Sequence, residues 1–413
     1  GSGGDLDSAR RAAVEGIEIA QWAGDPWIEA LTRLALGASH VLAGQTAEGV
    51  EILSQALIAF RNCGDVYGRT ATRLWLAVAY HDLRQEQHLI PCLHDLLALC
   101  EGNGYHALLT AATFVGLPDP HRAAPLLILA RDRRVRPAYA HRLLTELGLA
   151  EIEVHPGYQL RVQTLGGFRV WRGDVEVAAR EWQRDKARQL FQLLITARGQ
   201  WLQREEITER LWPNLTPDAA LRDFKVALNA LNKAIEPQRP ADAPFAFVVR
   251  DGSTYRLRPE ADLWLDAEAF RAACEGGLRL LAAGKADEGL AQLRSGLALY
   301  RGDYLPDALY EDWASEERER LLALYLRTAD RLATELITRQ AYDEGLQLCE
   351  AILTRDVCWE RAYRLMMAAY AAQGNCGQAL KTYSRCVDAL RRELDVGPSA
   401  ETRALYRRLG GAL

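Results

Sequence analysis

Residues 221–236 read LRDFKVALNALNKAIE, and this stretch carries two stripes of side chains. Apolar residues recur at three- and four-residue spacing, which is typical of the buried face of a helix. They are Leu221, Phe224, Leu228, Leu231 and Ile235. Basic and amide residues follow one position later, so we expect them on a second face about 100° round the helix. They are Arg222, Lys225, Asn229 and Asn232. Their polar groups need hydrogen-bond partners, which either water or another molecule can provide.

The residues around this helix predict a small module over 158–260. Residues 158–177 alternate like short antiparallel strands, with turns at Gly166-Gly167 and Gly173-Asp174. Helices are expected at 185–198, 203–211 and 218–235, the last with Thr216 as N-cap and Pro217 in its first turn. Segments 245–250 and 254–258 flank Asp251-Gly252-Ser253, which is a β-hairpin signature. This order of elements predicts a winged helix-turn-helix.

The later helix of a helix-turn-helix lies in the major groove of DNA. Arginine suits guanine, asparagine suits adenine, and lysine suits guanine or phosphate. We therefore predict that Arg222, Lys225, Asn229 and Asn232 contact bases of double-stranded DNA, and that Lys233 contacts phosphate. The alternative is a solvated helix face. The helix is third in its run and precedes a hairpin, and this context favours DNA.

Two further groups are predicted to contact the DNA backbone. Arg250 and Arg256 alternate with apolar residues of the hairpin, with Ser253 and Thr254 at its turn. A solvated edge hairpin is the alternative. The second group opens the first helix and consists of Arg184, Lys186 and Arg188. Trp182 beside them is expected in the core.

Both flanks of this module are helical. Residues 5–150 and 261–413 share a layout of turn, polar helix start and apolar helix, and 151–157 form a linker. Leu346 and Leu380 stand 34 residues apart, which is the tetratricopeptide period. The predicted fold is mainly α, with tetratricopeptide-like repeats flanking the winged helix. Such repeats bind partners along a concave face, which Trp22, Trp27, Trp75 and Tyr80 would line if they do not pack in the core.

Composition bounds the function. The net charge is -5, but residues 158–260 carry 17 Lys and Arg against 13 Asp and Glu, so the module is basic between acidic flanks. The eight cysteines form no metal-ligand pattern, and we expect reduced thiols in a cytoplasmic protein. No catalytic motif, cofactor loop, metal site or membrane span is present, so an enzyme is not expected.

The initial GSGG resembles a cloning remnant, which suggests a fragment of a larger regulator. The run over 316–320 is expected to be a solvated helix face.

The chain resembles a known family at these residues. LGGFRVWRGD, REEITERLWP and VALNALNKAI resemble the response-regulator (OmpR/PhoB) type of winged helix found in Streptomyces antibiotic regulatory proteins. LYRGDYLPDALYEDWASEERERL and ALKTYSRCVDALRRELDVGPSAETRALYRRL resemble the bacterial transcriptional activator domain that follows it. Residues 5–150 are similar to the repeats of MalT-like signalling ATPases. Asn232 and Lys233 stand where the family usually has two basic residues, so base preference should differ.

The resemblance implies a transcriptional activator that binds direct repeats upstream of a promoter and recruits RNA polymerase. It implies that the loop Pro213, Asn214, Leu215 and Thr216 faces the sigma or alpha subunit of polymerase. Direct repeats would hold two copies on DNA, as a dimer or as separate molecules. The repeats would bind a protein or a small-molecule effector. The alternative function is an interaction scaffold in which the winged helix is a docking module.

Overall fold

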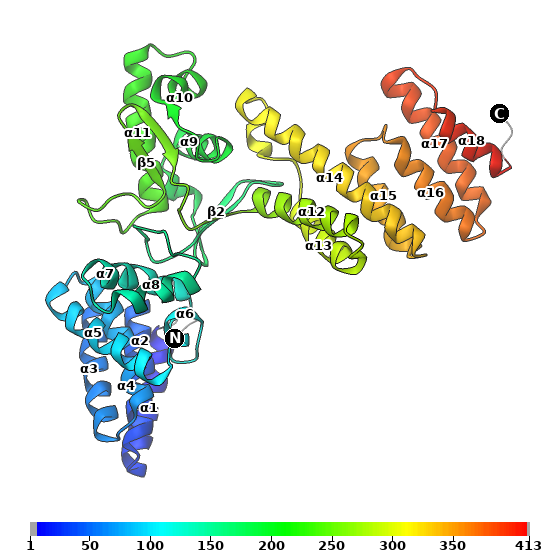
Figure 1. The fold of residues 1–413 in the computed structure, drawn as a ribbon. Coiled ribbons are helices and arrows are strands. Elements are labelled where there is room, and N and C mark those ends of the chain that lie inside the picture. Colours follow the sequence, from blue (N-terminus) through cyan, green and yellow to red (C-terminus); the bar gives the residue numbers. More distant parts are fainter. Residues whose placement is uncertain (1–5, 411–413) are drawn as a thin grey trace. The chain divides into compact units, whose positions relative to one another are not determined.

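A computed structural model of the protein describes residues 6–410 (Figure 1). Residues 1–5 and 411–413 lie outside the described part, and with them the GSGG stretch, Asp5 and the last predicted residues. Within the described part, residues 6–161 and 171–263 form one compact unit, and residues 162–170 and 264–410 form a second. Within the described chain, strands occur only between residues 160 and 265, so the prediction of a mainly α fold is confirmed. Residues 162–170, which sequence reasoning assigned to the 158–260 segment, pack with the second unit.

The first unit begins with a run of helices that pack on one another in sequence. They are α1 (Leu6–Ala23), α2 (Pro26–Leu42), α3 (Thr46–Asn62), α4 (Val66–Asp82), α5 (Glu86–Asn103), α6 (Ala107–Thr110), η1 (Pro120–Ala123), α7 (Ala124–Asp132) and α8 (Pro137–Glu146). Glycines let α2 and α3 approach closely. A Cβ atom on Gly37 would lie 2.6 Å from Leu53 Cγ, and one on Gly49 would lie 2.8 Å from Val41 Cγ2. The glycine near the start of α3, Gly49, is therefore a packing requirement.

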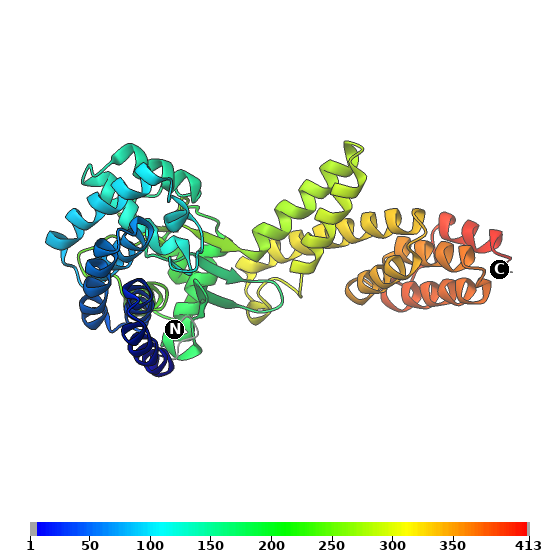
Figure 2. The same ribbon diagram turned by 90° about the horizontal axis from the view of Figure 1, so that it is seen from below.

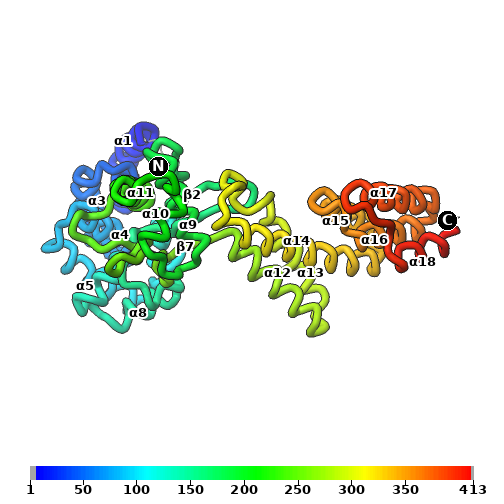
Figure 3. Tube along the Cα trace, turned by 90° about the horizontal axis from the view of Figure 1, so that it is seen from above, coloured from blue at the N-terminus to red at the C-terminus, as the bar shows by residue number. Residues whose placement is uncertain are grey.

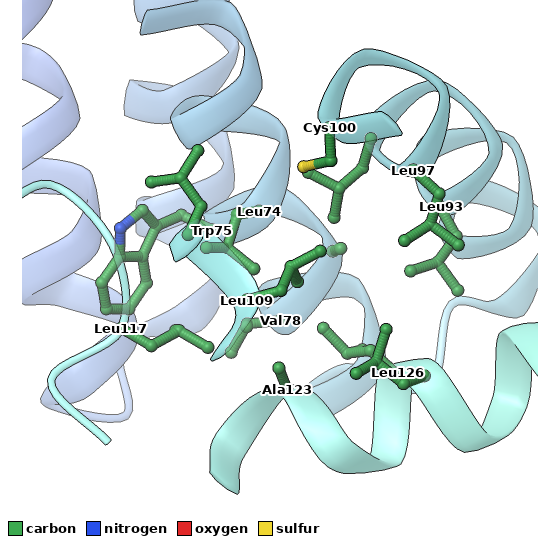
Figure 4. Packing of buried hydrophobic residues seen from close by; sticks show 14 of the residues in the cluster. Leu74, Trp75, Val78, Leu93, Leu97, Cys100, Leu109, Leu117, Ala123 and Leu126 are labelled. Atoms are coloured by element: carbon green, nitrogen blue, oxygen red, sulfur yellow. The ribbon is translucent and has the colours of Figure 1, made fainter. Parts of the chain in front are cut away.

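The core of this helical region gathers around α4 and α5, and Figure 4 shows the apolar side chains that fill it. The segment after α5 completes this core with Leu117 and neighbouring residues. Trp75 is buried in it, and its Nε1 donates to Val115 O at 2.8 Å. Trp75 is therefore a core residue and is not available to a ligand, while Trp22 and Trp27 are exposed.

The predicted linker at 151–157 is packed against the rest of the first unit. His155 is buried, with its Nε2 3.1 Å from Asp262 Oδ2. His121 Nε2 lies 3.4 Å from the same oxygen, and His121 Nδ1 lies 2.7 Å from Asp119 Oδ1. The hydrogen bond to Asp119, aided by the Asp262 carboxylate, raises the pKa of His121. These contacts fix the linker to the end of the strand-bearing segment.

Two small sheets lie between the helical regions. The first has the order β3-β2-β1-β7 and contains β1 (Leu160–Gln163), β2 (Arg169–Arg172), β3 (Val175–Glu176) and β7 (Leu263–Leu265). The β2–β3 turn falls at the predicted Gly173-Asp174 position. Strand β7 was not predicted. It follows the hairpin segment by several residues, and a three-residue strand leaves too short a pattern to detect.

The three-helix module, which we define as residues 179–257, belongs entirely to the first unit. It contains η2 (Ala179–Trp182), α9 (Asp185–Thr196), α10 (Arg204–Leu211) and α11 (Pro217–Ile235). Its sheet has the order β4-β6-β5, from β4 (Leu202–Gln203), β5 (Val248–Asp251) and β6 (Thr254–Leu257). The three predicted helices and the predicted hairpin are all present. The short strand β4 was missed because its pairing with β6 depends on a distant segment.

The hairpin segment begins later than predicted, because residues 245–247 are held by a side chain. Glu236 caps the end of α11 and is buried. Its Oε1 and Oε2 both accept from Ala246 N at 3.1 Å, and Oε1 also accepts from Phe247 N at 3.2 Å. These bonds replace the ladder bonds that a longer β5 would make.

The second unit is a further series of helix pairs, seen in Figures 2 and 3. Its elements are α12 (Asp266–Ala282), α13 (Ala286–Leu299), η3 (Pro306–Ala308), α14 (Asp312–Thr338), α15 (Tyr342–Arg355), α16 (Glu360–Ala372), α17 (Cys376–Leu394) and α18 (Ala400–Arg408). Residues 300–311 form an insertion that separates α13 from α14. The 34-residue spacing of Leu346 and Leu380 corresponds to α15 and α17.

The charged run over 316–320 departs from the prediction of a fully solvated face. Glu317 is buried and accepts from Arg271 Nη2 at 2.6 Å, and burial raises the pKa of Glu317. Arg318 Nη2 and Nε donate to Ala308 O at 2.8 Å and to Tyr304 O at 3.0 Å. Glu317 therefore ties α14 to α12, and Arg318 ties α14 to the segment that precedes it. The prediction failed because both partners come from segments that folding brings to α14.

The loop at 164–166 is anchored on the start of α12. Asp266 is 3% exposed. Its Oδ1 accepts from Thr164 N at 2.8 Å and from Thr164 Oγ1 at 2.6 Å, and its Oδ2 accepts from Leu165 N at 2.9 Å. Leu165 also forms a β-bridge with Tyr304. One carboxylate therefore satisfies three donors from a segment about 100 residues away.

Candidate nucleic-acid interface

Helix α11 has one buried and one exposed face, as its sequence predicts. Phe224 and Leu231 are buried, and the Phe224 ring meets the Tyr255 ring edge-on at a centroid distance of 5.0 Å. This contact fixes the hairpin on α11. On the other face, Arg222, Lys225 and Asn229 are exposed. Among the described residues, neither Arg222 nor Lys225 has an ion-pair partner, so both cations are free to meet an anionic ligand.

Asn232 does not share this exposed face, and that part of the prediction is wrong. Its side chain is 8% exposed, and its Oδ1 has no hydrogen-bond partner among the described residues. The reason is the rotation of successive residues round the helix axis, which is not a whole number of turns over this spacing. Ten residues at 100° each place Asn232 about 80° from Arg222 and only about 20° from the direction of Leu221. Asn232 thus turns toward the apolar stripe.

The same helical geometry places two other residues on the exposed face of α11. Lys233 lies about 20° and Val226 about 40° from the direction of Arg222. Lys233 is exposed, and Val226 is 42% exposed. Sequence reasoning omitted Val226 because an apolar residue in a helix was expected to face the core. Its angular position on a helical wheel was the available signal.

The two hairpin arginines, Arg250 and Arg256, make different contacts. Arg250 is exposed, and its Nε donates to Gly252 O at 2.7 Å. The Arg256 guanidinium lies 4.3 Å from the centre of the Trp201 ring, just before β4. Stacking of this kind orients the plane of a guanidinium group. Arg258, two residues after Arg256, is tied to Glu260 by a 3.1 Å ion pair and lies largely buried.

The turn residues of the hairpin use their hydroxyl groups locally. Ser253 Oγ donates to Gln203 Oε1 at 3.2 Å, and Thr254 Oγ1 donates to Asp251 O at 2.7 Å. Both residues are half-buried. The Ser253 bond joins the hairpin turn to β4. Each hydroxyl oxygen can still accept a hydrogen bond, but its proton is already donated to another group of the protein.

The start of α9 holds the other predicted cations. Arg184 is exposed at the N-cap position, while Lys186 and Arg188 are half-buried. Lys186 Nζ lies 5.8 Å from the centre of the Trp212 ring. Trp182 is buried against Phe191, with ring centroids 5.9 Å apart, which confirms its assignment to the core.

The loop between α10 and α11 is fully accessible. Pro213, Asn214, Leu215 and Thr216 are all exposed, while Trp212 before them is buried. Thr216 occupies the N-cap position, but its side chain makes no capping hydrogen bond. The loop is therefore not held to α11 by a side-chain cap, and Leu215 presents an apolar side chain to solvent.

The described residues contain no group of three or more His, Cys, Asp and Glu side chains that could hold a metal ion. No helix in the described part of the chain is long and apolar enough to cross a membrane. The module instead offers a cationic and amide-bearing helix face beside a hairpin with two arginines, which matches the donors that contact DNA.

Comparison with known proteins gives this arrangement a context. Residues 265–409 match the family model of the bacterial transcriptional activator domain. The transcriptional regulatory protein MoaR1 of Mycobacterium bovis is 24% identical over 224 residues, which cover 54% of this chain and 71% of MoaR1. The regulatory protein DnrI of Streptomyces peucetius is 28% identical, covering 53% of this chain and 82% of DnrI.

Two further comparisons reach more of this chain. The regulatory protein AfsR of Streptomyces coelicolor is 24% identical over 60% of this chain, which corresponds to only 24% of AfsR. Mycobacterium tuberculosis EmbR, solved with a low-affinity phosphopeptide, shares the fold with a TM-score of 0.52 and 20% identity, over 62% of this chain and 66% of EmbR. The chain is therefore similar to bacterial transcriptional regulators, and its residues 265–409 match their transcriptional activator domain.

Proposed function

We propose that the protein is a sequence-specific transcriptional activator of the Streptomyces antibiotic regulatory protein type. Residues 158–260 are the winged helix-turn-helix, and α11 is its recognition helix. The observation that carries the proposal is the exposed face of α11, where Arg222, Lys225 and Asn229 lie together on a helix held by its opposite face. Such a role places the protein in the bacterial cytoplasm.

The chemistry of this face suits the major groove of B-DNA. Arginine donates two hydrogen bonds to guanine O6 and N7, and asparagine pairs with adenine N6 and N7. Arg222 and Asn229 lie about 20° apart round the helix and about 10 Å apart along it. They would therefore read base pairs about three steps apart. Lys225 and Lys233 flank them and would contact guanine or phosphate.

The remaining predicted cations would hold the module on the DNA backbone. Arg250 and Arg256 extend from the hairpin, and Arg184 and Lys186 lie at the start of α9. Phosphate contacts fix register without reading sequence. The Trp201 ring beside Arg256 would limit the directions in which its guanidinium reaches phosphate. Arg188, Ser253 and Thr254 would contribute less, because they are half-buried.

Arg222→Ala and Asn229→Ala are each expected to weaken binding to a selected duplex by about 1–3 kcal/mol, with little effect on random DNA. The reason is the loss of paired hydrogen bonds to one base. The measurement is a titration of the full chain with the duplex enriched by selection and with a shuffled duplex. Arg61→Ala and Asn62→Ala, at the exposed end of α3, are matched controls and should leave both affinities unchanged.

Failure of selection to enrich any sequence would remove the proposal. It would favour the alternative function, in which the three-helix module docks on a protein. Equal losses on both duplexes for Asn229→Ala would assign Asn229 to contact with the phosphate backbone or to folding.

We further propose that two copies bind direct repeats, and that the loop at 213–216 contacts the sigma or alpha subunit of RNA polymerase. The exposed Leu215 supports this proposal, since the loop and the Arg222 face of α11 are both accessible. The helical repeats would then receive a regulatory protein or small molecule. In the repeats, Trp75 lies in the core and cannot serve that purpose.

Leu215→Ala is expected to lower promoter-dependent transcription about fivefold while leaving DNA affinity unchanged, because one apolar contact with polymerase is lost. The measurement is a run-off transcript with purified polymerase on the selected promoter. Leu309→Ala, at another exposed leucine, is the matched control. Equal transcript yields for Leu215→Ala and the unaltered protein would contradict a polymerase role for this loop.

A further inference from the structure

Val226 is the exposed apolar residue on the face of α11 that carries the base-reading side chains. It lies one turn after Arg222 and three residues before Asn229, about 40° and 60° from them round the helix. Its side chain is 42% exposed. The other large apolar residues of the helix behave differently, since Phe224 and Leu231 are buried against the module.

Folding does not account for a valine at this position. It makes no contribution to the buried core cluster under α11, and valine is a weaker helix former than alanine or the long polar residues. Isolated apolar side chains are ordinary on protein surfaces. The informative observation is the location of Val226, between two residues whose donors and acceptors suit base edges.

The major groove offers such a side chain one apolar complement. Base edges there consist of hydrogen-bond donors and acceptors, except for the C5-methyl group of thymine. We propose that Val226 contacts this methyl group and so selects thymine within the operator. The inference rests on the proposed DNA-binding function and adds a base preference to it.

The helix geometry limits where this thymine lies. Val226 is about 6 Å from Arg222 and about 4.5 Å from Asn229 along the helix axis. Base pairs of DNA stack about 3.4 Å apart. The thymine should therefore lie within about two base pairs of the positions that respond to Arg222→Ala and Asn229→Ala.

The test is a scan of the selected duplex in which each thymine is replaced, one at a time, by deoxyuridine. This change removes only the methyl group and keeps all hydrogen bonds. At one position in the stated window, the unaltered protein should bind about fourfold more weakly to the deoxyuridine duplex. The Val226→Ser variant should bind the two duplexes equally at that position.

Val175→Ser is the matched control, because Val175 is a 62% exposed valine in β3 and is not part of α11. It should keep the full response to methyl removal. Thermal unfolding of Val226→Ser should match that of the unaltered protein. The inference is overturned if no thymine lies in the window, or if replacing thymine by deoxyuridine there never weakens binding. It is also overturned if the affinity of Val226→Ser changes with the methyl group as much as that of the unaltered protein. These results leave the proposed function standing, whereas a failure to enrich any site removes both.

Discussion

Replacing Asp266 with alanine is expected to lower the free energy of unfolding of the second unit by about 3–5 kcal/mol. The buried carboxylate accepts from Thr164 N, Thr164 Oγ1 and Leu165 N. Without it, two backbone N–H groups and one hydroxyl remain buried with no acceptor. The cost of such groups exceeds that of losing an exposed hydrogen bond. The measurement is urea unfolding of the full chain, with hydrogen exchange followed over residues 162–170.

Asp343→Ala is the matched control for this variant. Asp343 also lies in the first turn of a helix, α15, but it is exposed. Its favourable interaction with the helix dipole is worth about 0.3–1 kcal/mol. Asp266→Ala should therefore cost several times more, with faster exchange of the Leu165 amide. Equal losses for the two variants would show that the carboxylate acts only through the helix dipole.

Replacing Glu236 with alanine is expected to cost about 2–4 kcal/mol of unfolding free energy. Glu236 is buried at the end of α11 and accepts from Ala246 N and Phe247 N. The variant leaves these two donors buried without acceptors, at the point where the chain enters the hairpin. The loss should appear in urea unfolding, with faster amide exchange at residues 245–251. Binding to DNA should weaken through the hairpin, since its entry is then less ordered.

Glu236→Gln separates hydrogen bonding from charge. Its Oε1 can still accept from both amides, so it should cost less than Glu236→Ala. Burial raises the pKa of Glu236 above its ordinary value of 4.5. A raised pKa in the folded state means that the stabilisation is complete below the unfolded pKa and is lost as pH rises through the folded pKa. Glu236→Gln should therefore compare more favourably with the unaltered protein at neutral pH than near pH 4.5. A larger deficit at neutral pH would contradict this assignment.

Local sequence pattern predicted much of the three-helix module. The apolar stripe of α11 has a helical period, and Phe224 and Leu231 are buried as that period requires. Alternation around Asp251-Gly252-Ser253 located the hairpin, because these residues accept the backbone of a tight turn. Such signals succeed because they depend on neighbours within a few residues.

Contacts between distant segments were not predictable in this way. The burial of Glu317 depends on Arg271, which lies on another helix. The stacking of Arg256 on Trp201 requires the pairing of β4 with β6. The local periodicity of the sequence does not predict these contacts between distant segments.

The sequence by itself determined which residues form helices and turns, and it determined that α11 has a packed face and a polar face. Periodicity and turn chemistry are properties of short segments, so they can be read without a fold. Only the tertiary structure decided which polar groups are available. Exposure depends on what the rest of the chain covers, and that buried Glu317 within a run of charged residues. It also decided that Asp266 and Glu236 are internal acceptors, since their donors come from segments that folding brings to them.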